Sequence, residues 1–199
     1  MDNTTQKKQV QINKDSKEEV NIGKELLSLV LYLLAVFVVT FLILHFVGQR
    51  TEVSGSSMEL TLSDGDNLIM DKITYRFRDP ARFDIVIFPV DQDTYYIKRV
   101  IGLPGETVRI DEEGNIYING SLLEEDYGIA RIEDPGRAIE SVKLGAGEYF
   151  VLGDNRNASL DSRFPEVGNI KREQITGRAW ARIYPFNEIT LLKNYEVKK

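Results

Sequence analysis

Residues 53–62 read VSGSSMELTL and place three small residues, Gly55, Ser56 and Ser57, between apolar anchors. Small residues let the backbone approach a ligand closely, and Ser57 supplies a hydroxyl at that place. A serine hydroxyl is a weak nucleophile until a base removes its proton. The segment also divides the chain, because a long apolar run precedes it and a strand-like pattern follows it. The rest of the sequence therefore has to show which base, if any, serves Ser57.

The composition narrows the possible chemistry. The chain has 199 residues, enough for one domain and an anchor, and its net charge of -6 makes a nucleic-acid partner unexpected. It contains no cysteine, which excludes disulfides, thiolate zinc sites and a cysteine nucleophile. Its single histidine, His45, lies at the end of the apolar run, so a histidine-based triad elsewhere in the chain is excluded. Any serine chemistry must use another base.

The apolar run, residues 26–47, contains no Asp, Glu, Lys or Arg. As a helix it would span about 33 Å at roughly 1.5 Å per residue, enough to cross a bilayer core. It is longer than the apolar region of a signal peptide, about 7–15 residues. Lysines gather before the run, and positive charge stays on the cytoplasmic side. We predict a cytoplasmic N-terminal tail (1–24), a transmembrane anchor (25–47) and an extracellular catalytic domain (48–199), forming a single-pass protein of the cell membrane.

The part after the anchor is predicted to be mainly β, with an antiparallel sheet. Short apolar runs bounded by Gly, Pro, Asp or Asn are typical of strands, and few segments are long and amphipathic enough for a helix. The expected strands are 68–70, 83–88, 95–101, 108–110, 116–118, 121–123, 148–152 and 174–184. Asn119-Gly120 is a strong hairpin signal between two of them. A small non-catalytic excursion is expected at about 108–147, and its acidic part, 124–147, is expected to lie on the surface.

Lys98 and Arg99 stand inside an apolar strand, and alternation places them on opposite faces. A buried lysine loses the solvation of its charge, so its pKa falls. For Lys98 to act as a base near neutral pH, its pKa must fall by about 2–3 units, which corresponds to roughly 3–4 kcal/mol of lost charge solvation. Arg99 stays protonated and is better interpreted as an ion-pair partner. From this strand alone, a Lys98 that reaches solvent from an edge strand remains the alternative.

The loop 153–163 reads GDNRNASLDSR and is dense in polar side chains. The spacing of Asp154 and Arg156, and of Asp161 and Arg163, suggests ion pairs within the loop that would stiffen it. A stiff polar loop suits the orientation of a base, because a neutral amine needs its hydrogen bonds fixed. An ordinary solvent loop is the alternative interpretation.

Taken together, these stretches resemble the type I signal peptidases, the membrane-anchored Ser–Lys proteases. The resemblance runs in order over most of residues 25–186 and is carried by SMELTL (57–62), RFDIVIF (82–88), YIKRVIGLPGE (96–106) and GDNRNASLDSR (153–163). It implies an antiparallel-sheet, signal-peptidase-like catalytic domain behind one transmembrane helix, of the compact Gram-positive type. It implies no metal and no cofactor.

The resemblance also assigns roles at the reacting centre. Ser57 would be the nucleophile and Lys98 the general base. The implied supporting residues are Ser159, Arg99, Asp154, Asp161 and Arg163. Of these, Ser159 would hydrogen-bond and orient the lysine, while the other four would form two ion pairs, Arg99 with Asp154 and Asp161 with Arg163.

The implied substrate-binding residues are Gly55, Met58, Leu62 and Ile97, with the last three lining shallow pockets for small side chains. Two positions depart from the family pattern. Leu60 stands where a proline is usual, and Gly55 stands where some relatives carry a hydroxyl that completes the oxyanion hole. The backbone N–H of Ser57, with a second N–H or a neighbouring serine, would then bind the oxyanion.

The implied function is removal of signal peptides from secretory precursors at the outer face of the membrane, with those precursors and the lipid bilayer as partners and no nucleic acid. The cleavage region would lie extended beside an exposed strand, and small pockets would select Ala-x-Ala-like ends. One alternative is the soluble Ser–Lys autoproteases with a DNA-binding domain, which the apolar run and the acidic charge disfavour. The other is an anchored β module without turnover, which the presence of both Ser57 and Lys98 disfavours.

Overall fold

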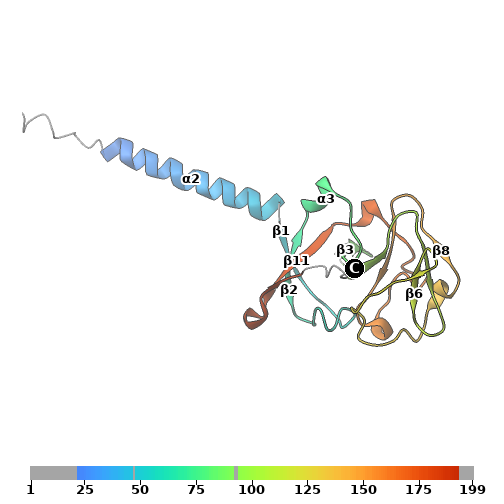
Figure 1. Ribbon diagram of the computed structural model, residues 1–199. Coiled ribbons are helices and arrows are strands. Elements are labelled where there is room, and N and C mark those ends of the chain that lie inside the picture. The colour runs from blue at the N-terminus through green and yellow to red at the C-terminus, as the bar shows by residue number, and fades with distance from the viewer. Residues whose placement is uncertain (1–21, 47, 92–93, 193–199) are drawn as a thin grey trace, which may run out of the picture. The chain divides into compact units, whose positions relative to one another are not determined.

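An apolar helix, α2 (Ile22–Phe46), forms most of the N-terminal unit of the chain (Figure 1). The computed structural model describes residues 22–46, 48–91 and 94–192, so the predicted tail at 1–24 lies mostly outside the described residues. Within the helix, residues Ile22–Phe41 have a mean hydropathy of 2.2, and none of that window is buried. A helix of this length and composition fits membrane anchoring.

The second unit, which begins at Leu44, is built on an antiparallel sheet. Its strands are β1 (Gly48–Glu52), β2 (Asn67–Asp71), β3 (Ile85–Pro89), β4 (Tyr95–Gly102), β9 (Glu148–Leu152), β10 (Ile170–Lys171), β11 (Gly177–Tyr184) and β12 (Thr190–Leu191). They lie in the order β1-β2-β11-β3-β4-β9-β10, and β12 pairs with β11. The predicted mainly antiparallel β fold is confirmed.

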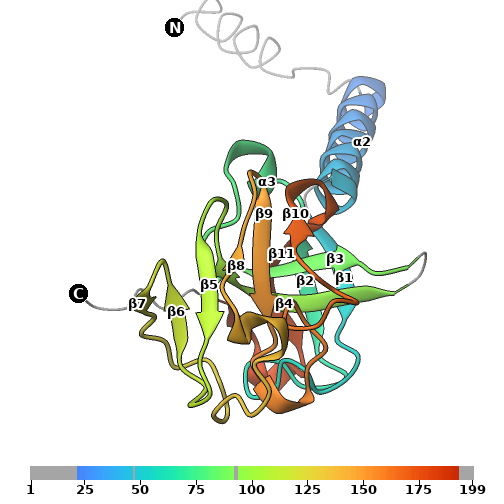
Figure 2. The ribbon, with the colours of Figure 1, turned by 90° about the vertical axis from the view of Figure 1, so that its right-hand side faces the viewer.

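Strand β4 is an interior strand of this sheet. Figure 2 shows β3 and β4 side by side, and the register places Val86 opposite Lys98. On its other side β4 pairs with β9, with Arg99 opposite Leu152. Lys98 lies just before this second pairing begins, but only 3% of its surface is exposed, so the alternative of a lysine that reaches solvent is wrong.

A smaller antiparallel sheet follows in the chain, in the order β7-β6-β5-β8. Its strands are β5 (Thr107–Ile110), β6 (Ile116–Ile118), β7 (Ser121–Leu122) and β8 (Val142–Lys143). The turn between β6 and β7 has positive φ at both Asn119 (53°) and Gly120 (83°). This geometry matches the twist of a hairpin and confirms the predicted turn. The remaining described helices are short: α3 (Thr74–Phe77), η1 (Gly136–Ile139), η2 (Arg156–Ala158), η3 (Arg172–Gln174) and η4 (Phe186–Glu188).

Both faces of the large sheet are packed, because alternate residues of each strand join different core clusters. On β3, Ile85 and Ile87 pack with Met58 and Leu62, whereas Val86 joins the opposite cluster. A third cluster joins the small sheet to Ile101, Phe150 and Leu152. Residues 124–147 were expected on the surface, but four of them belong to this third cluster: Tyr127, Ile132, Ala138 and Leu144. These buried residues are separated by Gly and Pro turns, so they show no period in the sequence.

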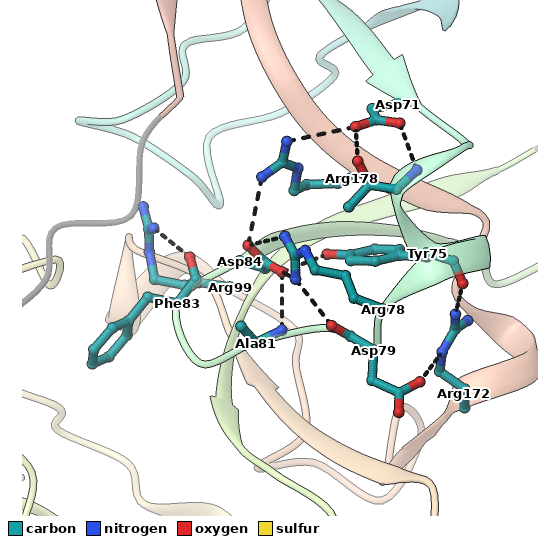
Figure 3. A network of polar contacts seen from close by, with 11 residues as sticks. Asp71, Tyr75, Arg78, Asp79, Ala81, Phe83, Asp84, Arg99, Arg172 and Arg178 are labelled. Carbon is teal, nitrogen blue, oxygen red and sulfur yellow. Dashed lines mark hydrogen bonds and ion pairs between the residues drawn. The ribbon is translucent and has the colours of Figure 1, made fainter. Parts of the chain in front are cut away.

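The turn before β3 is organised by Asp84, whose carboxylate is completely buried (Figure 3). It accepts hydrogen bonds from three residues: the Tyr75 hydroxyl (3.0 Å), the Arg78 guanidinium (2.8 Å from Nη1 and 3.4 Å from Nη2) and the Ala81 N–H (2.9 Å). The preceding residue, Phe83, has a φ of 70°, a conformation that β-strands do not contain. The strand predicted from residue 83 therefore begins at Ile85, and the turn directs the Phe83 carbonyl toward Arg99.

Candidate active site

The Ser57 hydroxyl and the Lys98 amine meet in the second unit of the chain, although 41 positions separate them in the sequence. Lys98 Nζ lies 2.7 Å from Ser57 Oγ, which is hydrogen-bonding distance. Strand β4 carries the lysine, and the tight turns of residues 53–62 carry the serine. The arrangement brings a nucleophile and a candidate base into direct contact.

Two anchors hold Ser57 in place. Met58 and Leu62 are buried in one core cluster, and the N–H groups of Thr61 and Leu62 both donate to the Met58 carbonyl. The Ser57 carbonyl accepts a 3.0 Å bond from the N–H of Asn155 in the polar loop. Gly153 of the same loop also lies against Ser57, because a Cβ atom added to this glycine would stand only 2.5 Å from the Ser57 carbonyl oxygen. The loop can approach the nucleophile this closely only with glycine at that position.

Lys98 is buried, with 3% of its surface exposed, and its amine lies 4.9 Å from the centroid of the Tyr96 ring. Burial lowers the pKa of this amine to about 8 from the usual 10.5, although Asp161 and Asp154 act in the opposite direction. Desolvation disfavours the ammonium form, as expected for a lysine in an apolar strand. A substantial fraction of Lys98 is therefore neutral slightly above neutral pH.

The two ion pairs implied by the family resemblance are present. Arg99 donates from Nε and Nη2 to the two carboxylate oxygens of Asp154, at 2.8 and 2.6 Å. Arg163 binds Asp161 in the same bidentate manner, at 2.8 and 3.0 Å. Both carboxylates are paired in this way, yet they still raise the pKa of Lys98, and burial outweighs their effect. The Asp154–Arg156 pair suggested by the spacing is not formed, because Arg156 pairs with Glu125.

Ser159 was expected to hydrogen-bond the lysine, and the structure does not bring the two groups together in that way. Its hydroxyl is buried and has no hydrogen-bond partner among the described residues. Lys98 Nζ is instead directed at Ser57 and at the face of Tyr96. Ser159 Oγ faces Gly153, where an added Cβ would lie 2.3 Å away.

A cavity of about 610 Å³ opens beside the serine and the lysine. It is lined by Thr51, Glu52, Val53, Ser54, Gly55, Ser56, Ser57, Met58, Thr94, Tyr95, Tyr96, Ile97, Lys98, Ala158 and Leu160. Gly55, Met58 and Ile97 line it as expected. Leu62 does not, because it is completely buried in the same core cluster as Met58. Sequence reasoning missed Tyr96, which alternation with Lys98 could have indicated.

Ser57, which lines the cavity, also carries a backbone N–H that is a candidate donor to a developing negative charge. Among the described residues no acceptor takes the Ser57 N–H, so this group is free to bind an oxyanion. Gly55 has a φ of 90° and donates its own N–H to Asp64 at 2.7 Å, which shapes the backbone before the serine. Among residues 22–46, 48–91 and 94–192, no group of three or more His, Cys, Asp or Glu side chains is arranged to hold a metal ion.

Comparison with known proteins gives consistent matches across this region. A family model described as signal peptidase, peptidase S26, matches residues 26–184. A probable signal peptidase I-2 from Synechocystis sp. is 44% identical over 154 residues, which cover 74% of this chain and 68% of the relative. Signal peptidase IB from Staphylococcus aureus is 32% identical over 191 residues, covering 88% and 98%. A crystal structure of a signal peptidase I from Enterococcus faecalis is 38% identical, with a TM-score of 0.42, and covers 51% of this chain and 97% of that chain.

Proposed function

The chain belongs to the signal peptidase I family, peptidase S26, whose members are serine peptidases, and from this we propose that it removes signal peptides from secretory precursors with Ser57 as nucleophile and Lys98 as general base. The single observation that carries the assignment of the two residues is their contact. A buried amine lies 2.7 Å from the serine hydroxyl, and the same burial keeps much of that amine unprotonated near pH 8.

The chemistry follows from this contact. Neutral Lys98 accepts the hydroxyl proton as Ser57 Oγ attacks the scissile carbonyl, and the Ser57 N–H binds the oxyanion. The protonated lysine then donates its proton to the leaving amine, so an acyl-enzyme remains on Ser57. Lys98 next takes a proton from water as the water oxygen attacks the ester carbonyl, and it returns that proton to Ser57 Oγ as the ester bond breaks and the new carboxylate is released. Apart from the water that is consumed, these proton transfers use only Ser57 and Lys98.

The cavity suits an extended peptide that ends in small residues. It lies between residues 51–58 and the start of β4, so two backbone segments flank the space where a precursor would bind. A peptide strand in this space would gain main-chain hydrogen bonds, and its alternate side chains would point into the cavity. Met58 and Ile97 supply apolar side chains to its lining, and contact with them would favour alanine-sized side chains at the cut.

The apolar helix would place this chemistry at a membrane. Helix α2 ends at Phe46 and β1 begins at Gly48, so little chain separates the apolar segment from the catalytic unit. The lysines before the helix favour a cytoplasmic N-terminus and a catalytic unit on the outer face. Precursors held in the bilayer by their own apolar segments would share that surface with the enzyme.

Cleavage mapping tests the proposed function directly. The detergent-solubilised chain should cut a precursor peptide after an Ala-x-Ala sequence, and mass spectrometry of the products should show one new carboxyl end there. A matched peptide with leucine at both alanine positions should be cut at least about 100-fold more slowly, because the added volume does not fit narrow pockets. Equal cleavage of both peptides, or no cleavage of either, would contradict the proposal.

The pH dependence of the reaction should report the lysine. Because only neutral Lys98 accepts the serine proton, kcat/KM should rise with pH through about 8 and level off above it. The rates should be measured between pH 6 and 10, with circular dichroism at each pH to confirm that the chain remains folded. A flat pH profile would exclude this lysine as the base. So would a rise in kcat/KM centred near pH 6.5, which is the ordinary pKa of histidine.

A further inference from the structure

The Arg99 guanidinium is enclosed on every side by parts of the chain far apart in sequence. Besides the Asp154 carboxylate, it contacts the Phe83 carbonyl at 3.0 Å from Nη1 and Thr61 Oγ1 at 3.3 Å from Nη2. Figure 3 shows the Phe83 carbonyl reaching Arg99 from the turn that Asp84 holds. The remaining contact is the Tyr127 ring, whose centroid lies 3.7 Å from the guanidinium carbon.

Tyr127 does not come from the large sheet. It lies in the short segment 125–129, between β7 and η1. From the sequence, this region was expected to be a non-catalytic excursion. The residue is 8% exposed, and its ring packs against Phe83 at a centroid distance of 5.0 Å. An aromatic face over a desolvated guanidinium is an attractive contact that also excludes water.

The residues on either side of Tyr127 bind the polar loop. Glu125 accepts two hydrogen bonds from Arg156, at 2.7 and 2.9 Å, and both side chains are nearly buried. The N–H of Ile129 donates to the Asp154 carbonyl at 3.2 Å. Gly128 lies so close to Arg156 that a Cβ atom there would be 3.2 Å from the guanidinium carbon. Glu125, Tyr127, Gly128 and Ile129 of one short segment thus contact the polar loop or Arg99.

We propose that residues 125–129 form a positioning segment for the reaction, in which Tyr127 and Glu125 hold Arg99 and the loop 153–163 in the arrangement that the Ser57–Lys98 pair requires. The inference rests on the proposed function and extends it to a region outside the large sheet. Few residues separate the segment from the two reacting groups. Arg99 is next to Lys98 on β4, and the N–H of Asn155 in the loop donates to the Ser57 carbonyl. A change in either contact would move one of the two reacting groups.

The test compares Tyr127→Leu, which keeps most of the apolar volume, with Tyr127→Phe, which keeps the aromatic face. Tyr127→Leu should lower kcat about tenfold and leave KM within about twofold, because the reacting groups lose alignment while the cavity keeps its walls. Tyr127→Phe should restore the parental kcat. Tyr117→Leu is the matched control, since Tyr117 makes the same type of contact with Arg109, at 4.7 Å, on the small sheet away from the serine and lysine.

Hydrogen exchange supplies a readout that does not depend on turnover. Amides of residues 153–163 should exchange about tenfold faster in Tyr127→Leu than in the parent, and at the parental rate in Tyr117→Leu. If the parent cleaves no precursor, the proposed function fails and exchange alone decides whether the segment holds the loop. Should Tyr127→Leu not fold, Glu125→Gln tests the same segment through Arg156, with faster loop exchange again expected. Parental kcat or parental exchange in Tyr127→Leu, or equal losses in Tyr127→Phe or Tyr117→Leu, would overturn the proposal.

Discussion

Lys98→Met should lower kcat by about 10⁴-fold or more while leaving the chain folded. The substitution removes the amine that lies 2.7 Å from Ser57 Oγ and keeps the length of the buried side chain. A general base accelerates a reaction by about 10²–10⁴-fold. Removing one member of a nucleophile–base pair can cost more than this, because the remaining member cannot act alone. Ser57→Ala should cost about the same, and the double variant should be no slower than either single one, because the two residues act as a unit.

Lys98→Arg separates the role of the base from the role of the charge. Arginine keeps the positive charge but is not deprotonated in proteins, so this variant should be as inactive as Lys98→Met. Lys143→Met is the control, since Lys143 is exposed on β8. All variants should be assayed with the same precursor peptide, and thermal unfolding should show that Lys98→Met is at least as stable as the parent, because it removes the cost of burying an amine. Parental activity in Lys98→Arg would refute the neutral-amine mechanism.

Much of the fold could be predicted because its signals are local. The apolar helix, the interior strands and the hairpin at Asn119-Gly120 each follow from a run, an alternation or a turn pair within a few residues. Strands β1, β8, β10 and β12 were not predicted. They are short and weakly apolar, and their partners lie elsewhere in the chain, so their pairing is a tertiary property.

The site shows the same division. Ser57, Lys98 and the two ion pairs follow from short motifs, and the apolar neighbours of Lys98 in its strand predicted the burial of the lysine. The contacts of Glu125 and Tyr127 with Arg156 and Arg99 could not be predicted, because they join an aperiodic segment to distant residues. Ser159 and Leu62 show a limit of family resemblance: a motif indicates that a residue is near the site, but local packing decides which atoms it contacts.

The second large effect concerns stability and centres on the Arg99–Asp154 pair. Both side chains are almost completely buried, at 2% and 0% exposure. Arg99→Met should lower the free energy of unfolding by about 3–5 kcal/mol, because it leaves the Asp154 carboxylate buried without its counter-charge. For a chain of this size, that corresponds to a fall of roughly 10 °C in the midpoint of thermal unfolding.

A double-mutant cycle distinguishes the lost pairing from lost packing. Asp154→Asn alone should also destabilise the chain, but Arg99→Met combined with Asp154→Asn should cost about 0.5–3 kcal/mol less than the sum of the two, because neither charge is then left alone. Asp79→Ala serves as the control. That carboxylate also pairs with an arginine, Arg172, yet it is 81% exposed, so its loss should cost no more than about 1 kcal/mol (Figure 3). Thermal unfolding of the detergent-solubilised chain measures all four variants. Strictly additive losses would mean that Arg99 and Asp154 stabilise the domain independently and that the ion pair does not hold the loop to β4.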